Sequence, residues 1–534
     1  MAARGVRRGL VGVVAVAALV AAACGGDDSS SGDSSTGQTV DQGVKEGVSN
    51  ALGGSTNSTA ATRAQPETLE EWEALADTQR AAIVKKIKDN GWGKSADGKT
   101  VTGPDGFKID LTKCPAGWSD TEGASDTEIK IGHTTALSGT AADFGNGARA
   151  MEVVYRYYND QGVFTDATTG KTRKVNLIVK DDGYDPARTI PLVDELIDSE
   201  KVFAMVTLGS PTTLKVYDKL NQRCIAHPLV PTGHPAWADP INHPWTTGLQ
   251  VAYSTEAVLW GAFIERRLDE FPEGKVRVAS LVATNDYGKI YDSSFRAYLA
   301  QSTNKDRIEY VNESVEVTAP TITDPMTTLA AKNPDVFILM SGGVQCTQAI
   351  QEAAQNGMKD TAKYLFTSQN CKSSSYVSKA KVGGDGSASN GWWIVGGGIR
   401  DMNSPAEDGN EYVLWARQLL TSAGIDPKAS GNYVLGFEYS FPLIQALRIA
   451  GELDGGVTRS NVILALRAMD MTHPMLLDGI NFNMSGNADA YLIEGSEISQ
   501  YESARQQWIQ QGPIIDLSGK SQNCAFNQAN QTCG

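Results

Sequence analysis

The sequence lacks most of the short motifs by which a catalytic or metal site can be recognised. It contains no G-x-S-x-G nucleophile elbow, no H-E-x-x-H zinc motif and no C-x-x-C pair. Histidine is scarce, and its five copies do not have the spacing of metal ligands. Neighbouring acids such as Asp181 and Asp182 follow an expected strand, where carboxylates more often cap helices than catalyse reactions. We therefore expect a protein that is not an enzyme and that uses no metal or cofactor.

The chain also has too little positive charge for a nucleic-acid-binding protein. Lys and Arg number 47 against 62 Asp and Glu, which gives a net charge of −15 at pH 7. Binding to a phosphate backbone needs a basic surface. The charge balance argues against nucleic acid as a partner and fits a solvated, exported domain.

The apolar run near the N-terminus is too short to be a comfortable membrane span. It covers Gly9–Ala23, 15 residues, and three arginines precede it. A basic start, a short apolar core and small residues before a cleavage point indicate an export signal over residues 1–23. Its removal takes three arginines and no acid, which moves the net charge to −18.

The segment LVAAAC that ends at Cys24 resembles the bacterial lipobox, although Ala21 stands where that pattern prefers leucine. The resemblance implies that Cys24 is lipidated and becomes the mature N-terminus, so that the membrane is reached through a lipid anchor only. A secreted protein with a chance cysteine is the alternative. Residues 24–66 include GGDDSSSGDSSTGQTV, and we expect a flexible, Gly/Ser-rich tether with nothing to bury.

Six cysteines remain after the signal, and an even number outside the cell indicates disulfides. Six cysteines allow 15 connectivities. Proximity along the chain favours Cys346–Cys371 and Cys524–Cys533, which leaves Cys114 with Cys224.

Residues 67–125 form an extension ahead of the main body. Thr68-Leu-Glu-Glu71 has the pattern of a capping box, and apolar residues at helical spacing follow it up to Gly91. The stretch KTVTGPDGFKID then predicts two short strands around a Pro-Asp-Gly turn. The extension is too small to fold alone, so we expect it to pack on the main body and to be held there by Cys114.

From Glu128 the chain alternates apolar strands with amphipathic segments. The expected strands are EIKIGHTT, KVNLIVKD, VFAMVTL, IAHPLV, KVRVASLVAT, RIEYVNESV, DVFILM, KYLFTS and WWIVGG. The expected helices between them include Ala148–Tyr158, Thr189–Ile197, Ala252–Leu268, Tyr291–Ala300 and Thr347–Gly357, and a helix-rich region covers Gly409–Met469. This order predicts an α/β fold of βαβ units with parallel sheets, and its length predicts two lobes.

One strand ends in an unusual turn, VFAMVTLGSPTTLKVYDKL (Val202–Leu220). Pro211 suits the first position of a helix, which would make Ser210 the N-cap. Backbone N–H groups at such a turn can bind an anion. An ordinary capped helix is the alternative.

Taken together, five motifs resemble the branched-chain amino-acid-binding proteins of ABC importers, which are type I periplasmic binding proteins. They are IKIGHTTALSGTAADFGNGARAMEVVYRYYNDQG, VKDDGYDP, VTLGSPTT, VPTGHP and ATNDYG, in the family's order, and the resemblance covers about Glu128 to Leu517. It implies two doubly wound parallel-sheet lobes joined by a three-segment hinge, with the ligand in the cleft between them.

By the same resemblance, lobe one would comprise residues 126–250 and 396–475. Lobe two would comprise residues 251–395 and 476–517. Residues 518–534 would then be a polar C-terminal tail.

The resemblance also implies ligand contacts from lobe one. Ser210 occupies the place of the serine that binds the ligand's carboxylate, and Thr212 follows it. Thr232, Gly233 and His234 occupy the next turn, which supplies a carbonyl and a hydroxyl, although one residue is missing from that loop. Phe144 stands where the family has a tyrosine against the ligand side chain. Tyr287, in NDYG, matches a wall residue of lobe two.

Two positions depart from the family pattern. Gln369 stands where the family has a glutamate that holds the ligand's ammonium. Val344 stands where the family has a tyrosine, directly after the pair Gly342-Gly343. Gly343 is itself an expected ligand contact. A neutral amide does not supply the charge-assisted bond, worth about 1.5–3 kcal/mol. A carboxylate without an ammonium, urea or a short amide therefore competes with a branched-chain amino acid. A misalignment by one residue is the alternative, with Asp286 or Glu352 supplying the charge.

The resemblance implies a lipid-anchored binding protein on the outer face of the bacterial cytoplasmic membrane. It would capture a small polar ligand by hinge closure and present it to the permease and ATPase of an ABC importer. The alternative is a sensor or interaction lipoprotein that uses the same clamp without transport.

Overall fold

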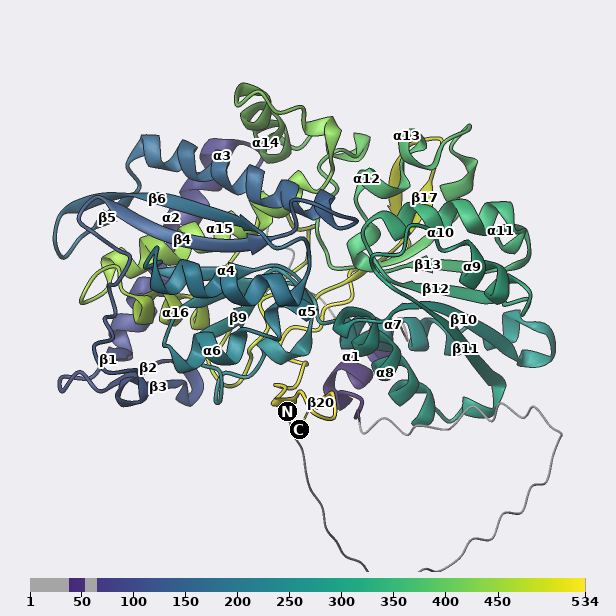
Figure 1. Ribbon diagram of the computed structural model, residues 1–534, viewed down its shortest axis with the longest axis horizontal. Helices are drawn as coiled ribbons and strands as arrows, with labels where there is room; N and C mark the ends of the chain where they lie inside the picture. Colours follow the sequence, from purple (N-terminus) through teal and green to yellow (C-terminus); the bar gives the residue numbers. More distant parts are fainter. Residues whose placement is uncertain (1–37, 53–64, 534) are drawn as a thin grey trace, which may run out of the picture. The chain divides into compact units, whose positions relative to one another are not determined.

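The structure is a computed structural model that describes residues 38–52 and 65–533 (Figure 1). The expected export signal at 1–23 and the lipidation site at Cys24 lie outside these residues. Within them, no helix combines the length and the apolar character that crossing a membrane would need.

The first sheet follows the expected strand–helix alternation. Its strand order is β5-β6-β4-β7, with β4 parallel to both neighbours and β5 antiparallel. A parallel bridge between Ala204 and Ala226 extends it to β8, which pairs with β9. The strands are β4 (Glu128–Thr135), β5 (Phe164–Asp166), β6 (Lys171–Asp181), β7 (Ala204–Thr207), β8 (His227–Val230) and β9 (Thr246–Gly248).

Helices cover this sheet on both faces, as a parallel sheet requires. Figure 1 shows α3 on one side of the sheet and α4 on the other. Gly436 of α15 lets that helix lie directly against α3, because a Cβ there would be 2.4 Å from the Cβ of Ala150. The helices of this first lobe are α3 (Asn146–Gln161), α4 (Pro186–Asp198), α5 (Ser210–Thr213), α6 (Tyr217–Gln222), α14 (Glu411–Ser422), α15 (Tyr433–Glu452) and α16 (Arg459–Arg467).

The second lobe is built on a seven-stranded sheet of order β11-β10-β12-β13-β14-β17-β18. The first five strands are parallel to one another. Strand β17 is antiparallel to β14, and β18 is antiparallel to β17. They are β10 (Val276–Ala283), β11 (Ile308–Val315), β12 (Val336–Met340), β13 (Tyr364–Thr367), β14 (Trp393–Gly396), β17 (Glu497–Glu502) and β18 (Gln507–Gln510).

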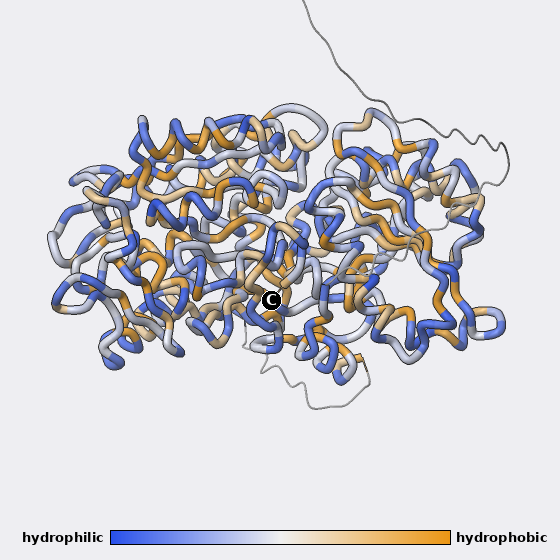
Figure 2. The backbone as a smooth tube through the Cα atoms, turned by 60° about the horizontal axis from the view of Figure 1, so that its bottom comes forward, coloured by the Kyte–Doolittle hydropathy of each residue, from blue (hydrophilic) through white to orange (hydrophobic). Residues whose placement is uncertain are grey.

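Strand β12 shows why its sequence is apolar throughout. Its side chains alternate between two separate cores, Val336, Ile338 and Met340 in one and Phe337 and Leu339 in the other. The helices of this lobe are α7 (Tyr253–Glu265), α8 (Asp286–Ala300), α9 (Thr323–Ala330), α10 (Val344–Gln355), α11 (Met358–Thr361), α12 (Ser374–Val377) and α13 (Lys379–Val382). In Figure 2 apolar residues recur at intervals along the coiled segments, the pattern of helices with one buried face.

From β4 to β18 the chain passes between the lobes three times: after β9, after β14 and before β17. We expected the third passage after residue 475, but the chain stays in the first lobe beyond that point. The hairpin of β15 (Asp470–Met471) and β16 (Phe482–Asn483) belongs to the first lobe, and the buried residues Leu476 and Ile493 share that lobe's core. Short, irregular segments carry weak periodicity, so their lobe was not visible in the sequence.

The extension folds as expected. Thr68 and Glu71 form the capping box of α2 (Leu69–Asp89). The hairpin of β2 (Thr100–Thr102) and β3 (Lys108–Asp110) gains a third strand, β1 (Gly93–Lys94). Both parts pack on the first lobe, where Trp72 and Val101 share its core.

All three favoured disulfide pairings are present in the structure. Cys114 is bonded to Cys224, Cys346 to Cys371 and Cys524 to Cys533. The first ties the extension to the first lobe, as the sequence predicted.

The expectation of a tether over residues 24–66 is wrong for its described part. Residues Gln42–Leu52 form helix α1, with Val44 and Val48 buried against the second lobe. Gly43 lets α1 lie close to the C-terminal segment, because a Cβ there would be 2.1 Å from the carbonyl oxygen of Lys520. Two valines four residues apart are a weak signal beside a Gly/Ser-rich segment, and packing rather than helix propensity stabilises so short a helix.

The C-terminal segment is not a simple polar tail either. Its strands β19 (Phe526–Asn527) and β20 (Thr532–Cys533) form a hairpin closed by the Cys524–Cys533 disulfide. Cys524 and Phe526 are buried in the core that also contains α1. The two ends of the described chain therefore pack together on one core.

Candidate functional site

A cavity lies between the lobes, at the carboxyl ends of strands from both sheets. This is where open α/β sheets bind ligands. The first lobe contributes Thr140, Ala141, Phe144, Tyr184, Leu208, Gly209, Pro231 and Thr232, together with Leu435 and Tyr439 of α15; the second lobe and the hinge contribute Gln250, Tyr253, Asn285, Tyr287, Val317, Gly342, Gly343 and Asn370.

The cavity wall is aromatic and uncharged. Five of its residues are Phe or Tyr, and among the residues described none that lines it is Asp, Glu, Lys, Arg or His. Tyr253 and Tyr287 meet edge to face with ring centroids 5.1 Å apart. Burial raises the pKa of both phenols, so they are neutral hydrogen-bonding groups. The wall suits an apolar or aromatic ligand body with neutral polar contacts.

The lobes are closed over the cavity. Thr140 Oγ1 of the first lobe donates to the Val317 carbonyl oxygen of the second at 2.9 Å. Asn432 Nδ2 donates to Tyr376 Oη at 2.8 Å, close to where the ring of Phe144 faces that of Tyr376. These bonds join residues far apart in sequence across the gap, which is what hinge closure requires.

Four of the predicted contacts meet at this cavity: Phe144, Thr232, Tyr287 and Gly343. Tyr287 Oη donates to the Ser341 carbonyl oxygen at 3.1 Å and lies 2.8 Å from Ser368 Oγ. Gly343 has a φ of +64°, and a Cβ there would be 3.1 Å from the Thr140 carbonyl oxygen. The positive φ and the close carbonyl therefore favour a glycine at this contact between the two lobes.

Ser210 does not cap the helix, and it lies behind the cavity wall. The N-cap of α5 is Gly209, with a φ of +97°, and Ser210 is the first helical residue. Ser210 Oγ shares a hydrogen bond with Thr232 Oγ1 at 2.7 Å, and Thr232 Oγ1 is 3.1 Å from Tyr253 Oη. Ser210 thus reaches the cavity only through Thr232.

The hydroxyl of Thr212 is turned into its own helix. It donates to the carbonyl oxygens of Leu208 and Gly209. Thr212 does not line the cavity, which corrects the predicted contact. A threonine hydroxyl that bonds the backbone three or four residues earlier is common within a helix.

Gly233 and His234 also lie outside the cavity. The Gly233 carbonyl oxygen accepts a bond from Tyr253 N at 2.7 Å, and a Cβ on Gly233 would be 2.3 Å from the Val251 carbonyl oxygen. The His234 ring is buried against Trp237 and Phe526, and burial lowers its pKa to about 3.

Gln369 serves the hinge rather than the cavity. Its Nε2 donates to the Val251 carbonyl oxygen at 3.0 Å, and its backbone N donates to the buried carboxylate of Glu256 at 2.8 Å. The next residue, Asn370, lines the cavity, and its Nδ2 is 3.2 Å from both Tyr253 Oη and Tyr287 Oη. The alternative of a misalignment by one residue places Asn370, not an acid, at the cavity. Neither Asp286 nor Glu352 lines it.

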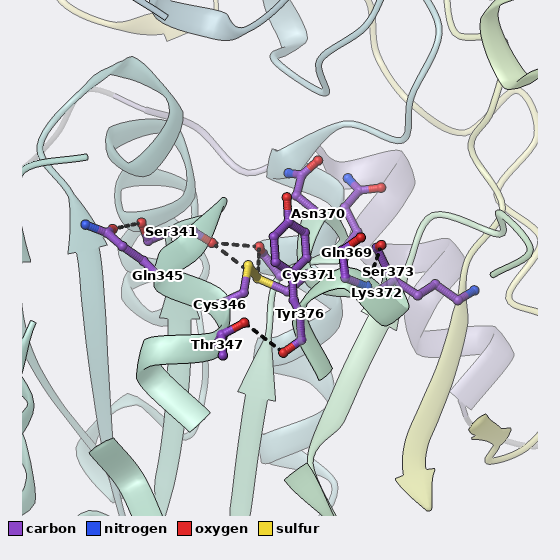
Figure 3. The surroundings of a disulfide bond; sticks show 12 residues. Ser341, Gln345, Cys346, Thr347, Gln369, Asn370, Cys371, Lys372, Ser373 and Tyr376 are labelled. Carbon is purple, nitrogen blue, oxygen red and sulfur yellow. Dashed lines mark hydrogen bonds between the residues drawn. A yellow bond between two sulfur atoms is a disulfide. The ribbon is translucent and has the colours of Figure 1, made fainter. Parts of the chain in front are cut away.

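A disulfide fastens two parts of the second-lobe wall. Figure 3 shows Cys346–Cys371 beneath the turn that carries Gln369 and Asn370. Helix α10 begins directly after Gly343, and Cys346 lies in its first turn. Cys371 directly follows Asn370. The bond therefore couples the Gly343 turn to the Asn370 turn.

Sequence reasoning missed several lining residues, among them Tyr184, Gln250, Asn370 and Tyr439. Asn370 was one position from a predicted contact. Tyr439 lies within a helix whose apolar residues are buried all round, so nothing in its pattern marks it as a wall residue.

The stretch GKSADGKT, Gly93–Thr100, has the letters of a phosphate-binding loop, G-x-x-x-x-G-K-T, and was also missed. In the structure it runs from β1 through a turn into β2, within the extension, and no α-helix directly follows it. A phosphate loop needs a strand before it and a helix after it. The match is therefore one of letters only.

In the described part of the chain, no group of three or more His, Cys, Asp or Glu side chains could hold a metal ion.

A family profile described as "Periplasmic binding protein" matches residues 128–489. Solved structures are similar in fold. A branched-chain amino-acid ABC transporter protein from Thermus thermophilus with bound valine is 15% identical, covers 73% of this chain and 96% of its own, and has a TM-score of 0.61.

Two further structures show the same likeness. A fatty-acid ABC transporter substrate-binding protein from Thermomonospora curvata is 19% identical over 75% of this chain and 95% of its own, with a TM-score of 0.59. A solute-binding protein from Rhodopseudomonas palustris BisB5 in complex with 3,4-dihydroxybenzoic acid is 18% identical over 74% and 98%, with a TM-score of 0.58. A search among curated proteins finds no match.

Proposed function

Because this chain belongs to the periplasmic binding protein family, we propose that its cavity captures one small ligand by hinge closure and presents it to the permease of an ABC importer. The family consists of extracytoplasmic binding proteins, not enzymes. The observation that carries the proposal is the uncharged, aromatic cavity enclosed by strand-end turns of both lobes.

The ligand's main body is apolar or aromatic in this proposal. Tyr184, Tyr253 and Tyr287 offer ring faces and edges, whereas an ammonium within the cavity would meet no carboxylate. The cavity itself therefore offers no charged partner to the ammonium of a free branched-chain amino acid. The similar structures carry valine, a fatty-acid specificity and a dihydroxybenzoate, which supports a fold that tolerates such bodies.

Magnitudes favour a ligand held by both lobes at once. Burying about 100 Å² of apolar ligand surface gains about 2.5 kcal/mol. Micromolar binding needs about 8 kcal/mol after the entropy of association is subtracted. One wall falls short of this, so Phe144 and Thr232 from the first lobe must act together with Tyr287 and Asn370 from the second.

The test is native mass spectrometry of the purified protein for a retained small molecule, followed by a thermal-shift panel. The panel contains leucine, urea, short amides and aromatic carboxylates. A ligand at 100 times its dissociation constant stabilises the folded protein by about 2.7 kcal/mol. Stabilisation by aromatic or apolar compounds supports the proposal, and tight binding of urea alone would overturn the apolar body.

We also propose that Cys24 anchors the protein in the membrane. The support is the lipobox-like LVAAAC segment and its place directly after an export signal. Expression in a bacterial host with labelled fatty acid should label the wild type and leave Cys24→Ala unlabelled. Equal labelling of both would remove the anchor.

The extension is the feature that would serve sensing without transport, because the binding cavity needs nothing from it. The extension at 67–125 packs on the first lobe and contributes no residue to the cavity. A receptor without transport would use that extension as a docking surface. Uptake of the identified ligand by cells that lack the protein separates the two functions.

A further inference from the structure

A second space lies beside the cavity, and we call it the polar chamber. It shares Phe144, Gln250, Asn370 and Leu435 with the cavity, so the two are neighbours separated by those side chains. The polar chamber differs in being charged: Lys372, Arg400, Asp401 and Glu438 line it.

The cations of the polar chamber already have partners. Lys372 Nζ is paired with the buried carboxylate of Glu497 and donates to the Ile399 carbonyl oxygen at 2.5 Å. Arg400 is paired with Glu407 at 3.1 Å and with Asp478 at 2.6 Å. Each therefore has an acidic partner, and Arg400 Nε is in addition buried without an acceptor among the described residues.

Glu438 of α15 is the acid left over. Its side chain is buried, with the residue 2% exposed, and among the described residues its Oε2 has no hydrogen-bond partner. Burial raises its pKa to about 8, against the opposing effect of Lys372. An unpartnered buried carboxyl group costs stability unless a ligand completes it.

The other titratable groups around Glu438 do not complete it. The His473 ring is bonded at Nε2 to the Glu438 backbone carbonyl at 3.0 Å, and burial lowers its pKa to about 4, so it is neutral. Asp401 accepts from Asn403 N at 3.2 Å, and burial raises its pKa to about 6. Tyr439, beside Glu438, is a neutral phenol whose hydroxyl accepts from Gln250 Nε2 at 3.1 Å.

Gln250 carries a second unused acceptor. Because its Nε2 is occupied by Tyr439, its Oε1 remains, and this atom is buried without a partner among the described residues. Gln250 lines both the cavity and the polar chamber. Gln250 Oε1 and Glu438 Oε2 are thus two buried acceptors without a partner among the described residues, and both residues line the polar chamber.

We propose that the polar chamber is the second half of the ligand site and takes a primary ammonium group, with Glu438 and Gln250 Oε1 accepting its N–H bonds. The inference rests on the proposed function, because the apolar body of the same ligand lies in the cavity. It makes the ligand an apolar or aromatic amine, whose cation meets Glu438 of the first lobe in a chamber that Gln369 also lines.

Binding of the ammonium is coupled to a proton. At pH 7 an acid with a pKa of about 8 is mostly protonated, so the empty site holds a neutral carboxyl group. An ammonium beside it favours the carboxylate. The proton of Glu438 then leaves to solvent, while the ligand keeps all three of its own protons.

The experiment is isothermal titration calorimetry of the mature protein with 2-phenylethylamine, 3-phenylpropionamide and 3-phenylpropionate at pH 7. Each titration is repeated in phosphate and in Tris, whose ionisation enthalpies differ. The amine should bind with release of close to one proton, and the amide with none. Glu438→Gln should weaken the amine at least tenfold and the amide less than twofold.

Glu494→Gln is the matched control. Glu494 is also a buried acid with a raised pKa, about 7, but it lines neither space and accepts from backbone groups of the C-terminal segment. This variant should keep the affinity and the proton release of the wild type. The proton count in the wild type needs no variant, so a poorly folded Glu438→Gln protein does not block the test.

The outcomes separate the two proposals. If the amide or the carboxylate binds and the amine does not, or if the amine binds without releasing a proton, the ammonium subsite is wrong and the proposed function stands. If none of the three probes binds and only non-aromatic, non-apolar solutes do, the apolar cavity itself is wrong and the subsite falls with it.

Discussion

The two walls of the cavity are held in place by different means. In the first lobe, the Gly209 turn is fixed by close packing, because a Cβ on Gly209 would lie 2.3 Å from the ring of Tyr184. Hydroxyl groups continue that wall, from Ser210 through Thr232 to Tyr253. Every restraint in this wall is non-covalent.

In the second lobe, the Gly343 and Asn370 turns follow neighbouring strands β12 and β13 and are joined by the Cys346–Cys371 bond. Tyr287 adds bonds to Ser341 and Ser368 behind them. The comparison indicates that the first wall is set by the packing of its sheet, whereas the second needs a cross-link to hold two loops in register.

The largest expected effect comes from removing that cross-link. In Cys346→Ala/Cys371→Ala we expect a loss of about 3–4 kcal/mol in the free energy of unfolding, given the 25-residue separation. Because the two turns then move independently, ligand affinity should fall as well. Urea titration measures the first quantity and calorimetry with the identified ligand the second.

Cys524→Ala/Cys533→Ala is the control for this change. It removes a bond of separation 9 that lies outside the cavity, so we expect about 2–3 kcal/mol of destabilisation and an unchanged affinity. Equal affinity in both double variants would show that the second wall needs no cross-link.

A smaller effect is expected at Gly343, where the walls meet. Gly343→Ala should cost about 1–3 kcal/mol through its positive φ. It should also hold the lobes apart, since the new Cβ meets the Thr140 carbonyl oxygen at 3.1 Å. Small-angle scattering would register opening as a larger radius of gyration in the presence of ligand.

Gly357→Ala separates strain from obstruction. Gly357 has a φ of +82°, and among the described residues a Cβ there would have no neighbouring atom within 4 Å, so this variant has the strain without the clash. It should lose stability and still close. A Gly343→Ala protein as compact as Gly357→Ala with ligand would contradict the contact between the walls.

Most of the fold followed from the sequence because its signals are local. Each of the nine expected strands overlaps a strand of the structure, since runs such as DVFILM are buried on both faces and are short. The Thr68–Glu71 capping box fixed the start of α2 in the same way. Helix α1 was missed because its stability comes from contacts with the second lobe, which no window of the sequence contains.

The site was predictable only in part, for a related reason. The family's motifs placed Phe144, Thr232 and Tyr287 at the cleft, and all three line one cavity. They do not say which way a hydroxyl or a ring points within a turn, so Thr212 and His234 were placed wrongly. Glu438 lies in the middle of a buried helix, and only the packing of α15 against the hinge brings it to the polar chamber.

The smallest expected effect tests the hydrogen-bonded wall. Thr232→Val keeps the shape of the side chain and removes the hydroxyl, which leaves Ser210 and Tyr253 each without one partner. We expect a loss of about 1–2 kcal/mol in the free energy of unfolding, measured by urea titration. Thr232→Ser keeps the hydroxyl and should lose less. Adding Ser210→Ala to Thr232→Val should cost little more, because the two hydroxyls act as one unit. If the losses of stability in Thr232→Val and Ser210→Ala simply add, the hydroxyls do not act as a unit. The first wall is then held by packing alone, as Gly209 is held by the ring of Tyr184.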